Sequence, residues 1–140
     1  MKISHTLIQL IIVGGSHGLS FVANFTNLQE LTLSFANFFN VDNFGDFEKL
    51  QGVTFTQLRI LKFEGLCPNH GCLTKFLENN GRNLEELHIR TESHSLNLAI
   101  VKLCPNLKSL ATIFGDDEVE TLKVILNGCQ ELESLGVITI

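Results

Sequence analysis

The chain has 140 residues, of which 44% are hydrophobic and 18% are charged, and its formal net charge is -5. This length and composition predict one domain with a hydrophobic core and exclude a disordered chain. Only ten Lys and Arg residues are present, and no apolar run approaches the roughly 20 residues that span a bilayer, so we expect neither nucleic acid nor a membrane as a partner.

The first apolar run extends from Leu7 to Val13 and follows Lys2, which is the outline of a secretory signal. A signal needs a longer uninterrupted apolar region and a small-x-small cleavage site. The same residues also fit a strand of the repeat described below, and we favour that interpretation.

Residues 14–18 then read G-x-S-x-G, after the expected strand and before a possible helix over 19–25. This is the context of a hydrolase nucleophile elbow, in which Ser16 would attack a carbonyl carbon. Its partners would be an acid, Asp116 or Asp117, and a histidine, His88 or His94. The expected order is serine, acid, histidine, but no histidine follows Asp117. A serine hydrolase is therefore kept only as a remote alternative, and we expect no catalytic residues.

One phrase recurs along the chain, as NLQELTL, QLRILKF, NLEELHI, NLKSLAT and ELESLGV. The opening leucines are Leu28, Leu58, Leu84, Leu107 and Leu132, at intervals of 30, 26, 23 and 25 residues, and a degenerate copy, TLIQLII, opens at Leu7. Because side chains alternate along a strand, each phrase predicts a strand with one buried face. The expected buried residues include Leu31, Leu33, Leu61, Phe63, Leu87 and Ile89, and Thr112 is the one polar exception in the pattern.

The stretches between these phrases have helical spacing. One helix would bury Leu96, Ile100 and Leu103, and the next would bury Val119, Leu122, Leu126 and Cys129. Asp116, Asp117 and Glu118 mark the start of the latter helix, and Gly81 and Gly128 mark helix ends. A phenylalanine cluster in the longest repeat is expected to pack in the core: Phe35, Phe38, Phe39, Phe44 and Phe47.

A strand and a helix in about 25 residues cannot bury both apolar faces alone, but stacked copies can. We therefore expect an α/β solenoid, with a curved parallel sheet on the concave side and helices on the convex side. Residues 1–140 form one domain of about six repeats in this prediction.

Three segments carry a resemblance to a known family: LCPNLKSL at 103–110, GCQELESL at 128–135 and NLEELHI at 83–89. They resemble the cysteine-containing leucine-rich repeats of fungal F-box proteins. Cys104 and Cys129 precede their opening leucines by three residues, where other copies hold Phe25, Phe55 and Gly81, so this position resembles a buried plug at the helix end. The asparagine or cysteine ladder typical of such repeats is absent eight residues after the leucine, where Ala36, Leu66, Glu92 and Gly115 stand.

The resemblance implies the target-recognition part of an SCF-type ubiquitin ligase receptor, in which an N-terminal F-box binds a Skp1-type adaptor. Only six residues precede Leu7, so the adaptor is expected as a partner only if a missing F-box precedes this sequence. Polar end caps are also lacking, which favours a truncated array.

Alternation along the strands predicts which residues face a target protein on the concave side. They are Glu30, Thr32, Ile60, Lys62, Glu64, Glu86, His88, Arg90, Ser109, Ala111 and Ile113, with Ser34, Ser134, Gly136 and Ile138 on the same face. The middle strands present charges and the last two present small and apolar groups. The apolar end is either a pocket for a partner's anchor or a surface that missing repeats or a tail once covered.

Cys67, His70 and Cys72 in CPNHGC have the chemistry of zinc ligands, but no fourth ligand is evident, and a loop turned by Pro68 and Gly71 is the favoured interpretation. We expect no metal and no cofactor. The four cysteines are too few for a disulfide scaffold, which favours reduced thiols in the cytoplasm or nucleus. The predicted function is non-catalytic protein binding, and a general leucine-rich-repeat scaffold with no ubiquitin role remains an alternative.

Overall fold

The computed structural model describes residues 5–14, 18–35, 45–65, 67–115 and 119–139. Within these ranges, strands and helices form an α/β structure around a six-stranded parallel sheet. The strands are β1 (Gln9–Val13), β2 (Glu30–Phe35), β3 (Ile60–Gly65), β4 (Glu86–Glu92), β5 (Ser109–Phe114) and β6 (Ser134–Thr139). Their order in the sheet is their order in the chain, so each strand pairs with the one before it.

The leucine phrases set the register of this sheet. Leucines at the same place in each phrase are partners across all six strands: Leu10, Leu31, Leu61, Leu87, Leu110 and Leu135. The register shifts once, between β4 and β5, where His88 pairs with Ala111 but Glu92 pairs with Ile113. Four residues of β4 therefore match two of β5, which is a bulge in β4.

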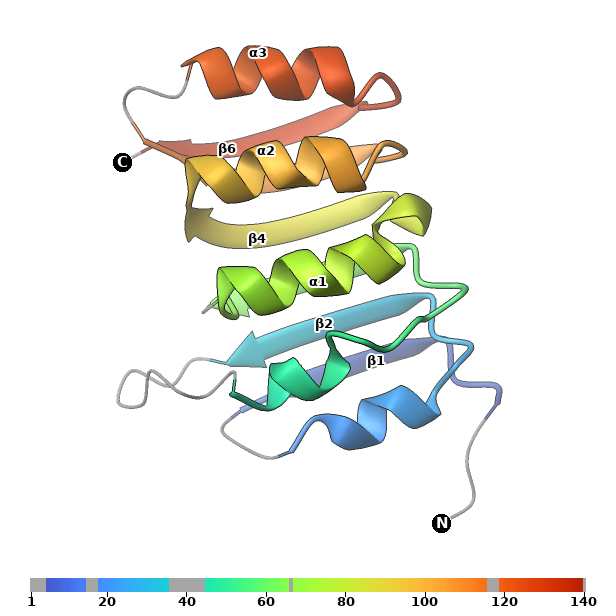
Figure 1. The fold of residues 1–140 in the computed structure, drawn as a ribbon. Coiled ribbons are helices and arrows are strands. Elements are labelled where there is room, and N and C mark those ends of the chain that lie inside the picture. Colours follow the sequence, from blue (N-terminus) through green and yellow to red (C-terminus); the bar gives the residue numbers. More distant parts are fainter. Residues whose placement is uncertain (1–4, 15–17, 36–44, 66, 116–118, 140) are drawn as a thin grey trace.

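Helical segments connect the strands and lie on one face of the sheet (Figure 1). The first two connections contain the 3-10 helices η1 (Ser20–Asn24) and η2 (Gly45–Leu50). The later ones contain α1 (His70–Asn80), followed by the 3-10 turn η3 (Gly81–Asn83), then α2 (His94–Leu103) and α3 (Val119–Gly128). Among the described residues, no helix has both the length and the apolarity needed to cross a membrane.

Side-chain caps start two of the α-helices. The Asn69 side chain accepts hydrogen bonds from the backbone amides of Gly71 and Cys72 before α1, and Ser93 accepts one from Leu96 before α2. Such caps satisfy amide groups that have no partner inside the helix. The loop predicted for CPNHGC therefore ends at Asn69, and Gly71, expected to turn that loop, instead lies in the first turn of α1.

The core lies between the sheet and the helices. The expected inward residues Leu31, Leu33, Leu61, Phe63, Leu87 and Ile89 are all buried, which confirms the predicted faces of these strands. Phe47 packs against Phe63 and Phe76, with ring centroids 5.6 and 5.3 Å apart. Phe47 thus confirms the core role predicted for its cluster. Phe38, Phe39 and Phe44, and the side chain of Phe35, lie outside the described part.

The buried face of α3 agrees only in part with the prediction, since Cys129 is buried and Leu122 packs against the core as expected. Val119 and Leu126, expected to be buried, are 60% and 53% exposed, whereas Thr121 and Ile125 face the core. The predicted spacing placed Leu126 on the buried face, whereas its neighbour Ile125 occupies that face. Thr121 is hydrogen-bonded through its hydroxyl to the His94 ring of α2 and can therefore be buried at low cost.

The two glycines at helix ends are needed for space. Gly81 follows α1 with φ at -66°, which any residue adopts. A Cβ on Gly81 would lie 2.4 Å from the carbonyl oxygen of Leu103, and one on Gly128 would lie 2.2 Å from Val101 Cγ1. Each glycine allows one unit, a strand with the helical segment that follows it, to approach its neighbour closely.

The threonine that breaks the repeat pattern has a buried partner. Thr112 occupies an inward position of β5 and donates a hydrogen bond of 2.9 Å to Oδ1 of Asn97 in α2. Both residues are buried. The Thr112 hydroxyl and Asn97 Oδ1 satisfy each other, as buried polar groups generally require, whereas Asn97 Nδ2 is buried without a hydrogen-bond partner among the described residues.

A row of asparagine side chains joins consecutive units. Asn27, Asn83 and Asn106 each precede an opening leucine and donate to a backbone carbonyl of the preceding unit, at His5 (2.7 Å), Thr56 (3.4 Å) and Arg82 (2.7 Å). Each acceptor stands two residues before its own leucine. An asparagine immediately before the opening leucine therefore hydrogen-bonds its unit to the backbone of the preceding unit.

Candidate functional site

The face of the sheet opposite the helices is called the open face here. It carries the alternate strand positions predicted to contact a target. Their middle positions form one row in the register, Ile11, Thr32, Lys62, His88, Ala111 and Gly136. Most of the predicted site residues are partly or fully exposed, so the open face does bring them together.

Thr32 is the exception. It lies on the open face as predicted, but only 5% of its surface is exposed. Its register partners are Ile11 and Lys62, and the Lys62 side chain extends from beside Thr32 toward Glu30. Thr32 therefore supports its neighbours and offers little surface for a partner.

A polar network crosses four strands of this face. The Gln9 side chain donates to the Glu30 carboxylate, and Lys62 Nζ lies 3.9 Å from Glu30 and 3.8 Å from Glu86. Nε2 of His88 lies 2.9 Å from the same Glu86 oxygen that faces Lys62. Each pair contributes only about 0–1 kcal/mol to stability because the groups are partly exposed. The network instead fixes where charges are presented.

One lysine between two carboxylates leaves a negative charge on the network. Glu64 of β3 is exposed, and no ion pair involves it within the described ranges. Arg90 is an exposed cation in β4, after Ile89 and within the irregular part of the register.

A second polar row lies at the strand starts, outside the network. Arg59 donates to Glu85 at 2.8 Å and to the Gln29 side chain at 3.4 Å, and Lys108 lies 3.4 Å from Glu85. The hydrogen bond from Arg59 lowers the pKa of the Glu85 carboxyl, and Lys108 acts in the same direction. Sequence reasoning did not identify this row, although its members occupy the same place in successive phrases.

The two rows meet at a small pocket. Two successive residues from each of three units line a cavity of about 210 Å³, which are Ile8, Gln9, Gln29, Glu30, Arg59 and Ile60. The cavity includes two predicted site residues, Glu30 and Ile60. The sequence analysis did not predict the other four. Gln29 and Arg59 lie just before their strands, and Ile8 and Gln9 belong to the degenerate first repeat.

Apolar groups lie at both ends of the open face. In β5 and β6, Ala111 pairs with Gly136 and Ile113 pairs with Ile138, as the sequence suggested. Ile11 and Val13 of β1 are also exposed, which the sequence analysis missed. The signal was present in LIQLIIV at 7–13, where strand alternation places both residues outward.

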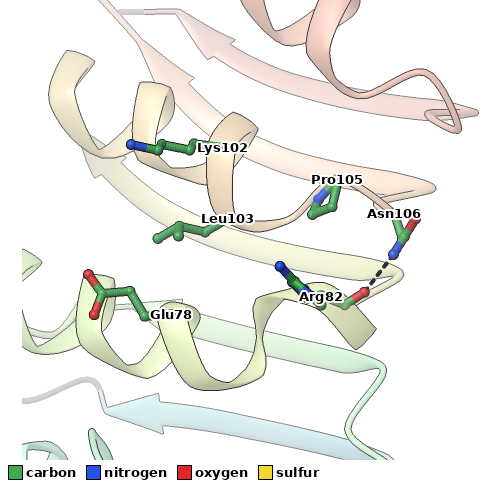
Figure 2. Close-up of a pocket in the computed structure, with 6 residues that line it drawn as sticks. All are labelled: Glu78, Arg82, Lys102, Leu103, Pro105 and Asn106. Carbon is green, nitrogen blue, oxygen red and sulfur yellow. Dashed lines mark hydrogen bonds between the residues drawn. The ribbon is translucent and has the colours of Figure 1, made fainter.

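A wider hollow of about 600 Å³ lies on the helix side, between α1 and α2. Figure 2 shows Glu78 on α1 and Lys102 and Leu103 on α2, with Arg82, Pro105 and Asn106 at its other end. Asn106 donates to the Arg82 carbonyl oxygen there. None of the predicted site residues lines this hollow.

The cysteines have the features of structural thiols. All four are free, and burial raises the pKa of Cys67 and Cys104 to about 12, with Cys129 also raising that of Cys104. Cys104 and Cys129 are buried at the ends of α2 and α3, as predicted for a plug. In the described residues, no group of three His, Cys, Asp or Glu side chains is arranged to hold a metal ion.

The proposed hydrolase residues are dispersed or lie outside the described ranges. Ser16, Asp116 and Asp117 belong to the latter group. Gly14 follows β1, whereas His88 lies in β4, and two intervening strands separate β1 from β4. His94 begins α2 and contacts Thr121.

The chain matches no protein-family model, and no related sequence is found among curated proteins.

Proposed function

We propose that the chain is a leucine-rich-repeat solenoid that binds a target protein on the open face of its sheet. The recurring leucine phrase and the in-register parallel strands support this architecture. In such an array each unit adds one strand to a continuous binding surface.

The observation that carries the binding role is the polar network from Gln9 to His88. It holds charged groups at set positions across four strands while leaving them partly exposed. Prepositioned polar groups beside apolar ones are typical of protein interfaces, where polar contacts orient a partner and apolar anchors supply most of the affinity.

The sequence resemblance extends this proposal to target recognition in an SCF-type ubiquitin ligase receptor. Cys104 and Cys129 at buried helix ends agree with the cysteine-containing class of repeat. The free, buried thiols also favour an intracellular setting, in the cytoplasm or nucleus. A Skp1-type adaptor is a partner in this proposal only when an F-box is joined to these repeats. A general scaffold without a ubiquitin role shares the same binding face.

The test compares charge reversals at two lysines, the partly exposed Lys62 and the exposed Lys75. Lys62→Glu places a third carboxylate beside Glu30 and Glu86 on the open face, whereas Lys75→Glu changes α1 on the helix side. Proteins co-purifying with the tagged chain are identified by mass spectrometry, and the affinity of a purified target is then measured for each variant.

We expect Lys62→Glu to weaken target binding at least tenfold and Lys75→Glu to leave it unchanged. The proposed binding face would be contradicted if the target bound the unmodified chain and both variants with equal affinity. It would also be contradicted if only Lys75→Glu weakened target binding. Recovery of adaptor and cullin subunits with an F-box-containing form would favour the ligase role over the general scaffold.

A further inference from the structure

The pocket at the starts of the first three strands is rigidly built. The carbonyl oxygen of Ile8 accepts from the amides of both Gln29 and Glu30, at 2.8 and 2.9 Å. The Gln29 carbonyl oxygen accepts from Arg59 and Ile60 in the same way, at 2.9 and 3.0 Å. The backbone of all three lining segments is thus fixed by the sheet, so the pocket exists before any ligand arrives.

Its polar side chains are also held in place. Glu30 is bound by Gln9 and lies near Lys62, while Arg59 is bound by Gln29 and Glu85. The Arg59 side chain is nevertheless 51% exposed. A guanidinium has five N–H donors, and the two hydrogen bonds of Arg59 leave others for a ligand.

The size of the pocket suits a single side chain of a partner. Sites for drug-sized molecules enclose about 300–1,000 Å³, more than the 210 Å³ found here. At about 30 Å³ per water molecule, this volume holds roughly seven waters. That is close to the eight non-hydrogen atoms of a tyrosine side chain.

The chemistry of the walls narrows the choice further. Ile8 and Ile60 offer apolar surface, whereas Arg59, Glu30 and the two glutamines offer hydrogen-bonding groups. A purely aliphatic side chain would take those polar groups out of water without replacing their hydrogen bonds, which is costly. Tyrosine has an apolar ring and a hydroxyl that can both donate and accept.

We propose that this pocket binds a tyrosine side chain of the target protein, with its ring against Ile8 and Ile60 and its hydroxyl accepting from Arg59. This inference rests on the proposed function, because it names the anchor with which the target engages the open face. Tyrosine is a frequent anchor residue at the centres of protein interfaces.

The test uses two small probes that differ by one hydroxyl, N-acetyl-tyrosinamide and N-acetyl-phenylalaninamide. Each is titrated into the isotope-labelled 140-residue chain, and backbone amide shifts are followed by NMR. We expect saturable shifts centred on residues 8–9, 29–30 and 59–60. The tyrosine probe should bind about two- to tenfold more tightly, because one net hydrogen bond is worth about that factor.

Two variants and one control test the apolar wall and the hydrogen-bond donor of the pocket separately. Ile60→Ser removes an apolar wall and should abolish binding of both probes, whereas Leu126→Ser, an exposed apolar residue of α3 on the helix side, should not. Arg59→Met removes the donor and should equalise the two probes. If Ile60→Ser alters the spectrum beyond the pocket, the Arg59→Met comparison still tests the hydroxyl contact.

Shifts scattered over the protein, equal binding of both probes, or a tyrosine preference that survives Arg59→Met would overturn the inference. Its failure can be told apart from that of the proposed function. A target that is lost with Lys62→Glu but retained with Ile60→Ser refutes the tyrosine anchor and leaves the binding face intact. A target that is indifferent to both variants refutes both.

Discussion

The two faces of the sheet have different chemistry even at neighbouring residues of one strand. Leu87 of β4 is completely buried against the helices, whereas the next residue, His88, reaches solvent and contacts Glu86. The covered face is almost entirely leucine, isoleucine and phenylalanine, and its polar member Thr112 is hydrogen-bonded to Asn97 of α2. The covered face therefore holds the core together, and residues of the open face can vary without loss of that core.

A charge on the covered face should have the largest effect. We expect Leu87→Asp to destabilise the protein by more than about 4 kcal/mol, because it removes a core leucine and buries a carboxylate without a partner. His88→Ala should change stability by less than about 0.5 kcal/mol. Thermal melts of both variants check this, and equal melting temperatures would contradict the assignment of the faces.

Replacing glycines on the helix side and on the open face should also change stability by different amounts. Gly81→Ala places a Cβ against the Leu103 carbonyl oxygen and should cost about 1–3 kcal/mol through overpacking. Gly136→Ala on the open face meets only Ala111 Cβ at 3.5 Å, an ordinary contact, and should be tolerated. Urea denaturation measures both. Equal losses would mean that Gly81 is not needed for close packing.

The buried Thr112–Asn97 pair tests whether hydrogen bonding compensates for a polar group on the covered face. Thr112→Val leaves Asn97 Oδ1 without this donor and should cost about 1–3 kcal/mol. The double variant Thr112→Val/Asn97→Leu should recover part of this loss. A double-mutant cycle measures the coupling, and strictly additive effects would show that the pair is not a unit.

Alkaline pH should destabilise the covered face through Cys104. Burial raises the pKa of this thiol from 9.0 to about 12, so between these values the unfolded chain releases a proton that the folded chain retains. Stability therefore falls as the pH rises through this window, by at most about 1.4 kcal/mol per unit. Raising the pH from 8 to 10 should lower the free energy of unfolding less in Cys104→Ala than in the unmodified protein. The same loss in both proteins would contradict a contribution from the Cys104 thiol.

The smallest effect is expected within the polar network. Lys62→Ala should change stability by about 0–1 kcal/mol, since its two ion pairs are partly exposed. Urea denaturation at low and high salt measures this. A loss of several kcal/mol would mean that the open face also holds the fold together.

Sequence patterns predicted the strands well because strand alternation has a strong signal, as at Leu61 and Phe63. They failed where a polar residue is buried with a partner. The α3 face was assigned only in part, because the predicted spacing left out Thr121, whose burial depends on a hydrogen bond to His94, a residue distant in sequence. Patterning also treats each position separately, so a pocket formed by adjacent residues of three units was not foreseen.

The asparagine contacts bear on how the protein loses its structure. Each joins one unit only to its immediate predecessor, so cohesion along the stack is a chain of local links. Leucines of the outermost strands, Leu10 and Leu135, are only partly buried, unlike Leu61 and Leu87. Fraying should therefore begin at the outermost strands and spread inward, with amide hydrogen exchange slowest in β3 and β4.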